Sequence, residues 1–206
     1  MQIDANVSEM FFGSFPILVE GDTEHAAFLA AVIEVDHQLA QQATIVKARG
    51  KALLAPLARI LRHFKVPFGI MHDADTPYNK NGGRNGVWTE NEKIRLEVEA
   101  ARSEGLTVNH HVSFPDFERW LEILAVSKDK PLNTYGSVSN NLPLITKGQE
   151  LFNLLCSGVN SDPISQEVLL EHDNDYMSAL LQISREEAQR IGEGNAIQYL
   201  GLPETD

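Results

Sequence analysis

Two short apolar segments of this chain end directly in acidic residues, and this pattern constrains the fold more than any other feature. Residues 16–19, Pro-Ile-Leu-Val, are followed by Glu20. Residues 67–71, Pro-Phe-Gly-Ile-Met, lead through one histidine into Asp73 and Asp75. Short apolar runs that stop at turn-forming residues are typical of buried strands. We therefore expect these acids to lie at the ends of two strands.

Strand and helix patterns alternate along the first 124 residues. The predicted strands cover residues 16–20, 44–48, 67–71 and 107–112. The predicted helices cover residues 6–15, a segment capped by Asp22 or Thr23, and residues 51–65, 89–103 and 116–124, with a mobile loop at 76–87. Such alternation is typical of a parallel sheet that is covered on both faces. The predicted fold class is α/β, with a parallel-sheet core flanked by helices.

The composition changes after Val126. Residues 127–143 are polar and contain Pro131, Gly136 and Pro143, which predicts a linker or loop. Short helical patterns follow from Ile145 to the end of the sequence. We therefore predict a first domain over residues 1–126, and a linker with a small C-terminal helical appendage over residues 127–206.

The charge of the chain bears on its binding partners. It has 17 basic and 29 acidic residues, for a net charge of −12. Phosphate-binding proteins usually present a basic surface, so this balance predicts weak DNA binding by the chain alone. Acidic residues that bind metal ions would add to this negative net charge, and the bound ions would neutralise them. Basic residues also cluster locally, at Lys47, Arg49, Lys51, Arg59, Arg62, His63 and Lys65, and at Lys80 and Arg84.

Several functional classes are excluded by missing motifs. No Gly-x-x-x-x-Gly-Lys-Ser/Thr loop occurs, so ATP hydrolysis is not expected. Cys156 is the single cysteine, and the histidines lack zinc-site spacing. No segment approaches the ~18 consecutive apolar residues of a membrane span, and the N-terminus lacks the pattern of a signal peptide. We therefore expect a cytoplasmic protein with no membrane partner.

The acids point to a metal site. Ligands of open α/β sheets bind beyond the carboxyl ends of the strands, where Glu20, Asp73 and Asp75 are predicted to lie. Carboxylates gathered in one place repel one another unless a cation holds them, and a pair of divalent metal ions is the usual solution. Each acid alone also has a structural interpretation: Asp73 as a turn former, Glu24 as a favourable charge at a helix N-terminus.

Lys51 leaves two interpretations open. It follows Gly50 and begins a helix, where its charge opposes the helix dipole. The mismatch suggests that Lys51 faces a phosphate, but an ordinary solvated lysine is at least as good an interpretation.

The order of the motifs resembles the Toprim (topoisomerase–primase) domain: Glu20-Gly21 after the first strand, Gly50 after the second, and Asp73-x-Asp75 after the third. The chain is more similar still to the overcoming-lysogenization-defect (OLD) family of nucleases. That resemblance covers about residues 6–135. It rests on Glu9-Met10-Phe11-Phe12, on residues 18–24 (Leu-Val-Glu-Gly-Asp-Thr-Glu), and on Asp73, Asp75, Glu118 and Lys130-Pro131.

The OLD resemblance implies two-metal cleavage of DNA, with ions ~3.5–4 Å apart at the reacting phosphate. The expected cofactors are two Mg²⁺ or Mn²⁺ ions, with Ca²⁺ as an inhibitory mimic. The implied metal ligands are Glu20, Glu24, Asp73, Asp75 and Glu118. A lysine should stabilise the pentacovalent phosphate; Lys130 is the first choice and Lys147 the reserve. The implied catalytic residues are therefore Glu20, Asp73 and Lys130.

The family also implies partners. Its members usually carry an N-terminal ATPase domain, so this chain would be a C-terminal catalytic region that lacks it. DNA is the implied substrate, and a homodimer is one option for the assembly. We therefore expect a Mg²⁺- or Mn²⁺-dependent DNA endonuclease, with exonuclease activity left open.

Other functions compete with this prediction. A non-catalytic metal-binding regulatory or interaction module would bind metal without cutting DNA. Primase or topoisomerase chemistry is a second alternative, although no tyrosine has the context of a nucleophile. A receiver domain that accepts phosphate on Asp73 fits the turn at Glu20-Gly21 poorly.

Overall fold

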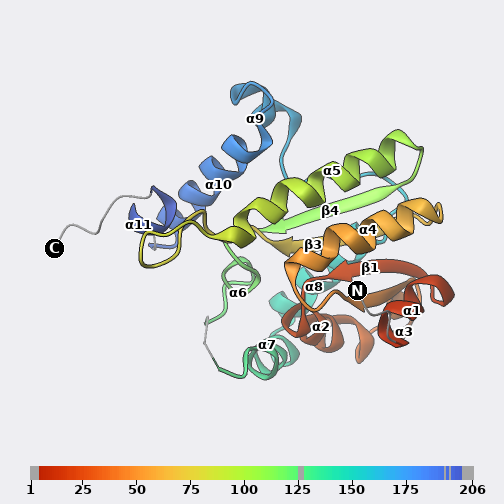
Figure 1. The fold of residues 1–206 in the computed structure, drawn as a ribbon. Helices are drawn as coiled ribbons and strands as arrows, with labels where there is room; N and C mark the ends of the chain where they lie inside the picture. Colours follow the sequence, from red (N-terminus) through yellow and green to blue (C-terminus); the bar gives the residue numbers. More distant parts are fainter. Residues whose placement is uncertain (1–4, 125–127, 193, 195, 201–206) are drawn as a thin grey trace.

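A parallel sheet forms the centre of the protein, seen in a computed structural model that describes residues 5–124, 128–192, 194 and 196–200 (Figure 1). Its strands are β1 (Phe15–Val19), β2 (Ala43–Lys47), β3 (Phe68–Asp73) and β4 (Val108–Ser113). Their order is β2-β1-β3-β4, and every neighbouring pair is parallel. The prediction of a helix-flanked parallel sheet is confirmed, and all carboxyl ends lie at one edge.

The strand order creates a switch point between β1 and β3. The chain leaves β1 for β2 on one side and returns to β3 on the other side. Ile17 is paired with Gly69 and Leu18 with Ile70, so the two strands are direct neighbours. The helical connections that follow β1 and β3 therefore diverge to opposite faces, which leaves a crevice beyond the strand ends.

Helices cover both faces of the sheet because side chains alternate along each strand. Leu18 packs with α1 (Ala5–Phe12), α4 (Leu54–His63) and α5 (Glu90–Ser103). Ile17 and Val19 belong to the opposite core. That core is covered by α2 (Asp22–Phe28), the π-helical segment η1 (Leu29–Ile33), α3 (His37–Ala40), α7 (Lys130–Ser139) and α8 (Leu142–Leu155).

A third core lies beside β4 and α5. Val112 packs there with Ile164, Tyr176 and Leu180. This core joins α9 (Gln166–Glu171) and α10 (Tyr176–Arg190) to the sheet, and α11 (Ala196–Tyr199) contacts α10. The remaining short elements are η2 (Lys51–Leu53), η3 (Gly86–Thr89) and α6 (Phe117–Trp120). In the described part of the chain, no helix has the length and apolar character that a membrane span requires.

The linker expected over residues 127–143 is wrong for the residues that form α7 and the start of α8. Pro131 lies in the first turn of α7, where a missing N–H does no harm. Thr134 and Val138 are buried, and α7 packs against α2. The composition of this segment, rich in polar residues, Gly and Pro, therefore predicted a linker where the chain forms a packed helix. The predicted division between residues 126 and 127 falls outside the described residues, and it stays a prediction.

One predicted helix cap also differs from the structure. Gly21, rather than Asp22 or Thr23, is the N-cap of α2, because the Glu24 carboxylate accepts its N–H at 3.0 Å. At the start of α5, Thr89 occupies the N-cap position, but its hydroxyl donates to the Gly86 carbonyl and does not cap the helix.

Candidate metal centre

The crevice between β1 and β3 brings two of the predicted acids together. Glu20 directly follows β1, and Asp73 is the last residue of β3. The Glu20 carbonyl accepts the Gly50 N–H at 2.9 Å, where Gly50 adopts a φ of +125° that a side chain would disfavour. The Ala74 N–H donates to the Ser113 carbonyl at 2.8 Å. These backbone bonds hold the strand ends, and with them the two carboxylates, in fixed positions.

Two further acids approach from the helices. Glu24 lies in the first turn of α2 and is 4% exposed. Glu118 lies in the first turn of α6 and is 3% exposed. Asp116 is the N-cap of α6, and its side chain accepts the Arg119 N–H at 3.0 Å. Carboxylates this deeply buried are uncommon unless they are paired.

The acids act on one another electrostatically. Burial raises the pKa of Asp73 well above its usual value, and the charges of Glu24, Glu20 and Asp75 raise it further. Burial also raises the pKa of Glu20 to about 7, with Asp75 as the second cause and Lys51 opposing. The pKa of Glu24 is raised by burial and by Glu118. Such mutual repulsion at the carboxyl ends of strands is the electrostatic signature of a cation-binding site.

Unpaired oxygens identify where a cation fits. Glu20 Oε2 and Asp73 Oδ1 are buried and, among the described residues, have no hydrogen-bond partner. Buried polar atoms without a partner are rare in native proteins, and carboxylate oxygens are the ligands that hard divalent ions prefer. The donor set therefore fits Mg²⁺ or Mn²⁺. Within the same described residues, no three His, Cys, Asp or Glu side chains already have the arrangement needed to hold one ion.

Lys51 is a part of this site whose role the sequence left unresolved. It is 2% exposed, so it is neither a solvated lysine nor open to a phosphate. Its ammonium donates to the carbonyls of Asp73 and Ala74 and to Asp75 Oδ2, the last at 2.7 Å. The only signal in the sequence was a lysine placed directly after a glycine turn.

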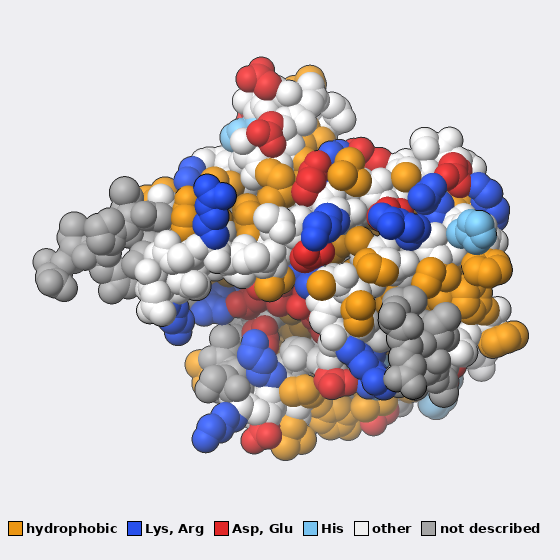
Figure 2. Space-filling model, in the orientation of Figure 1, with side chains coloured by type: hydrophobic (Ala, Val, Ile, Leu, Met, Phe, Trp, Pro, Cys, Tyr) orange, Lys and Arg blue, Asp and Glu red, His pale blue; other side chains and the backbone are white. Residues whose placement is uncertain are grey.

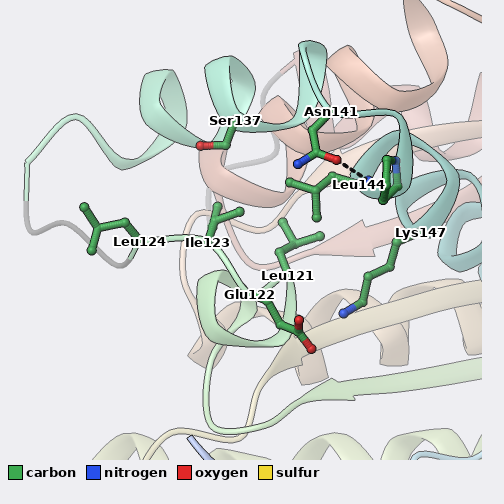
Figure 3. A pocket seen from close by; sticks show the side chains of 9 residues that line it. Leu121, Glu122, Ile123, Leu124, Ser137, Asn141, Leu144 and Lys147 are labelled. Atoms are coloured by element: carbon green, nitrogen blue, oxygen red, sulfur yellow. Dashed lines mark hydrogen bonds between the residues drawn. The ribbon is translucent and has the colours of Figure 1, made fainter.

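The structure separates the two candidate lysines. Lys130 is the first residue of α7, and its Nζ lies 2.8 Å from Glu118 Oε1. Lys147 instead donates to the Trp120 carbonyl, with its Nζ 4.5 Å from the centroid of the Trp120 ring. Figure 3 shows Lys147 among the side chains that line a pocket, together with Leu121, Glu122 and Leu144. The volume of this pocket is about 570 Å³. Of the two candidates for the catalytic lysine, Lys130 is thus the one that lies beside a predicted metal ligand.

A buried histidine pair supports the end of β3 from within the sheet. His72 Nε2 lies 2.9 Å from His110 Nε2, and His72 Nδ1 lies 2.9 Å from the Asp73 carbonyl. Burial lowers the pKa of His110 to about 3 and that of His72 well below its usual value. Both rings are therefore neutral at pH 7. With both nitrogens of His72 engaged in these contacts, the ring positions Asp73 and is not available as a ligand.

Most of the basic residues that cluster in the sequence are already neutralised. Arg59 is paired with Glu97, and both Arg62 and Lys65 are paired with Glu104. By contrast, Lys80 and Arg84 are exposed and have no ion-pair partner among the described residues. They lie in the loop that follows Asp75, where an antiparallel bridge joins Tyr78 to Arg84.

The sheet and the carboxylates at its switch point define a Toprim-like α/β protein. Residues 11–75 also match the family described as "Overcoming lysogenization defect protein-like, TOPRIM domain". The matched range contains Glu20, Glu24, Asp73 and Asp75, and it supports a Toprim domain of the OLD family in this chain. A comparison with curated proteins found no match. A Toprim domain indicates a metal-dependent role in nucleic-acid processing.

Proposed function

We propose that this chain is the catalytic part of a Mg²⁺- or Mn²⁺-dependent DNA endonuclease of the OLD type. The observation that carries the proposal is the pair of buried, unpartnered oxygens, Glu20 Oε2 and Asp73 Oδ1, at the β1–β3 switch point. The protein provides them with no hydrogen bond among its described residues, and their repulsion is relieved by a divalent ion.

The proposed ligands are Glu20, Glu24, Asp73, Asp75 and Glu118, as the family resemblance implies. Bound Mg²⁺ or Mn²⁺ supplies an activated water and stabilises charge on the phosphate oxygens, in the proposed reaction as a pair of ions. Lys130 stabilises the negative charge that develops on the phosphate. Its side chain is 47% exposed, so a phosphate can reach the ammonium while Glu118 holds it.

DNA is the proposed substrate, and its backbone is expected to pass Lys80 and Arg84. These two side chains have no acid to neutralise them among the described residues, unlike Arg59, Arg62 and Lys65. Figure 2 shows Asp and Glu side chains gathered in a hollow near where Figure 1 draws α2, α6 and α7, with Lys and Arg side chains at its margin. A negative hollow with cations at its edge suits a metal-bridged phosphate.

Plasmid cleavage tests this function. Purified protein is incubated with supercoiled plasmid and Mg²⁺ or Mn²⁺, with EDTA controls, beside Asp73→Ala and the matched surface variant Glu99→Gln. Glu99 is exposed on α5 and pairs with Arg95, away from the switch point. The proposal is supported if the wild type nicks or linearises the plasmid in a metal-dependent way, and if Asp73→Ala lacks this activity while Glu99→Gln retains it.

Two other results contradict the proposal in different ways. A folded protein that binds Mn²⁺ and never cuts DNA favours the alternative, a non-catalytic metal-binding regulatory or interaction module. A folded protein that binds no divalent ion removes the basis of the carboxylate site. Mn²⁺ binding is therefore measured alongside cleavage by electron paramagnetic resonance.

A further inference from the structure

The ammonium group of Lys51 is fully engaged. It has three N–H donors and three acceptors: the Asp73 carbonyl, the Ala74 carbonyl at 3.2 Å, and Asp75 Oδ2 at 2.7 Å. At 2% exposure, water has almost no access to it. A buried charge that is paired in this way is costly to separate from its partners. Lys51 is therefore a built-in cation at the end of β3.

Asp75 differs from the other acids because the lysine that contacts it is buried. Its backbone adopts a φ of +61°, and its N–H donates to the Pro115 carbonyl at 2.9 Å. Its Oδ2 is bound to Lys51, whereas Glu20 Oε2 and Asp73 Oδ1 have no partner among the described residues. Glu118 is also paired with a lysine, but that lysine, Lys130, has a side chain that is 47% exposed, whereas the side chain of Lys51 is 1% exposed. Asp75 is therefore the proposed ligand that is held by a buried cation.

We infer that Lys51 takes the place of one of the two cations of the proposed site. The free protein binds a single divalent ion at Glu20 and Asp73, whose Oε2 and Oδ1 have no partner among the described residues, and Asp75 is not a ligand while Lys51 holds it. A second ion beside Asp75 would face the ammonium at short range, where like charges repel. The inference rests on the proposed metal-dependent function, and it implies that the two-ion state requires Lys51 to release Asp75.

The neighbours of Lys51 make this inference testable by substitution. The Ala74 carbonyl also accepts from Asn91 Nδ2 at 2.9 Å, and the Asp73 carbonyl also contacts His72 Nδ1. Lys51→Met therefore leaves both carbonyls with a partner. It frees only Asp75, whose side chain is 31% exposed and can be hydrated. Methionine also retains the length of the apolar stem.

The experiment counts Mn²⁺ ions bound to the whole chain in the absence of DNA, by calorimetry and electron paramagnetic resonance. Wild type should bind one ion tightly and a second about 100-fold more weakly, because of the repulsion from Lys51. Lys51→Met should bind two ions with similar affinity, and Lys51→Arg, which keeps the charge, should behave as wild type. Asp75→Asn should keep the tight ion, and Asp73→Asn should lose it.

Three results would overturn the inference while leaving the proposed metal function intact. They are two ions of similar affinity in wild type, a single ion in both wild type and folded Lys51→Met, and loss of the tight ion in Asp75→Asn. If Lys51→Met fails to fold, the comparison of Asp75→Asn with Asp73→Asn decides the matter with Lys51 in place. No Mn²⁺ binding by folded wild type overturns the inference and the proposed function together.

Discussion

Lys130 Nζ lies 2.8 Å from Glu118 Oε1, and this ion pair ties the first residue of α7 to a buried acid of α6. Glu118 Oε1 makes no hydrogen bond of good geometry, so the contact is a charge pair rather than a directed bond. Burial lowers the pKa of Lys130, but its contact with Glu118 outweighs this and raises the pKa overall. Lys130 is therefore protonated wherever the proposed reaction runs.

Replacing Lys130 tests its proposed role in stabilising charge on the phosphate. Lys130→Ala should lower the rate of DNA cleavage by about 10²–10³-fold, the loss typical of removing one stabilising group from a transition state. Mn²⁺ binding should persist, because Lys130 is not a proposed ligand. Lys147→Met is the matched control, since Lys147 contacts Trp120 instead. Equal loss of cleavage in both variants would show that the effect is not specific to Lys130.

Asp73→Asn should separate stability from function. The charge of Asp73 is opposed by burial and by Glu24, Glu20 and Asp75, so its removal relieves repulsion in the metal-free protein. In EDTA the variant should have a free energy of unfolding that is higher by roughly 1–2 kcal/mol, and it should therefore unfold at a higher temperature. Such a gain is common when strained functional groups are replaced. Calorimetry with and without Mn²⁺ measures this. A lower melting temperature in EDTA would contradict the repulsion argument.

Glu20 should make the metal-free protein less stable as pH rises. Its folded pKa of about 7 lies above the ordinary 4.5, so the folded state holds the proton more tightly. That contribution is fully present below pH 4.5 and is lost as pH rises to about 7. The loss is on the order of 3 kcal/mol. The measurement is the free energy of unfolding of wild type minus that of Glu20→Gln in EDTA, at several pH values. A difference that does not change with pH would contradict the assignment.

The buried histidine pair should have the opposite effect at acid pH. The pKa of His110 is lowered to about 3 and that of His72 is also lowered, in both cases chiefly by burial. Their contribution to stability is present above the ordinary pKa of 6.5 and is lost as pH falls below it. His110→Gln should weaken this acid sensitivity, while His37→Gln, at an exposed position, should leave it unchanged. Denaturant titrations between pH 4 and 7 measure both.

Lys80 and Arg84 should contribute to DNA binding. Replacing both with alanine should weaken binding roughly tenfold and reduce the salt dependence by about two counterions. Fluorescence anisotropy with duplex DNA in Ca²⁺ measures binding apart from cleavage. Arg59→Ala is the control, because Arg59 is already paired with Glu97. If the control loses as much affinity, the path of the DNA lies elsewhere.

The sequence by itself determined the strands and the acids that follow them. Short apolar runs such as residues 16–19 have few alternatives to a buried strand, and an acid directly after such a run must lie at its end. Strand–helix alternation then determined that the sheet is parallel. For these reasons the positions of Glu20 and Asp73 at one edge of the sheet could be predicted without coordinates.

Only the tertiary structure decided which groups meet at that edge. The order β2-β1-β3-β4 places Glu20 beside Asp73, and the pairing of Lys51 with Asp75 joins residues from separate strand–helix units. The helical state of Lys130–Ser139 also depends on packing against α2, which overrides a composition typical of a linker. Local patterns report the conformation of a segment, whereas burial and charge pairing depend on parts of the chain that are distant in sequence.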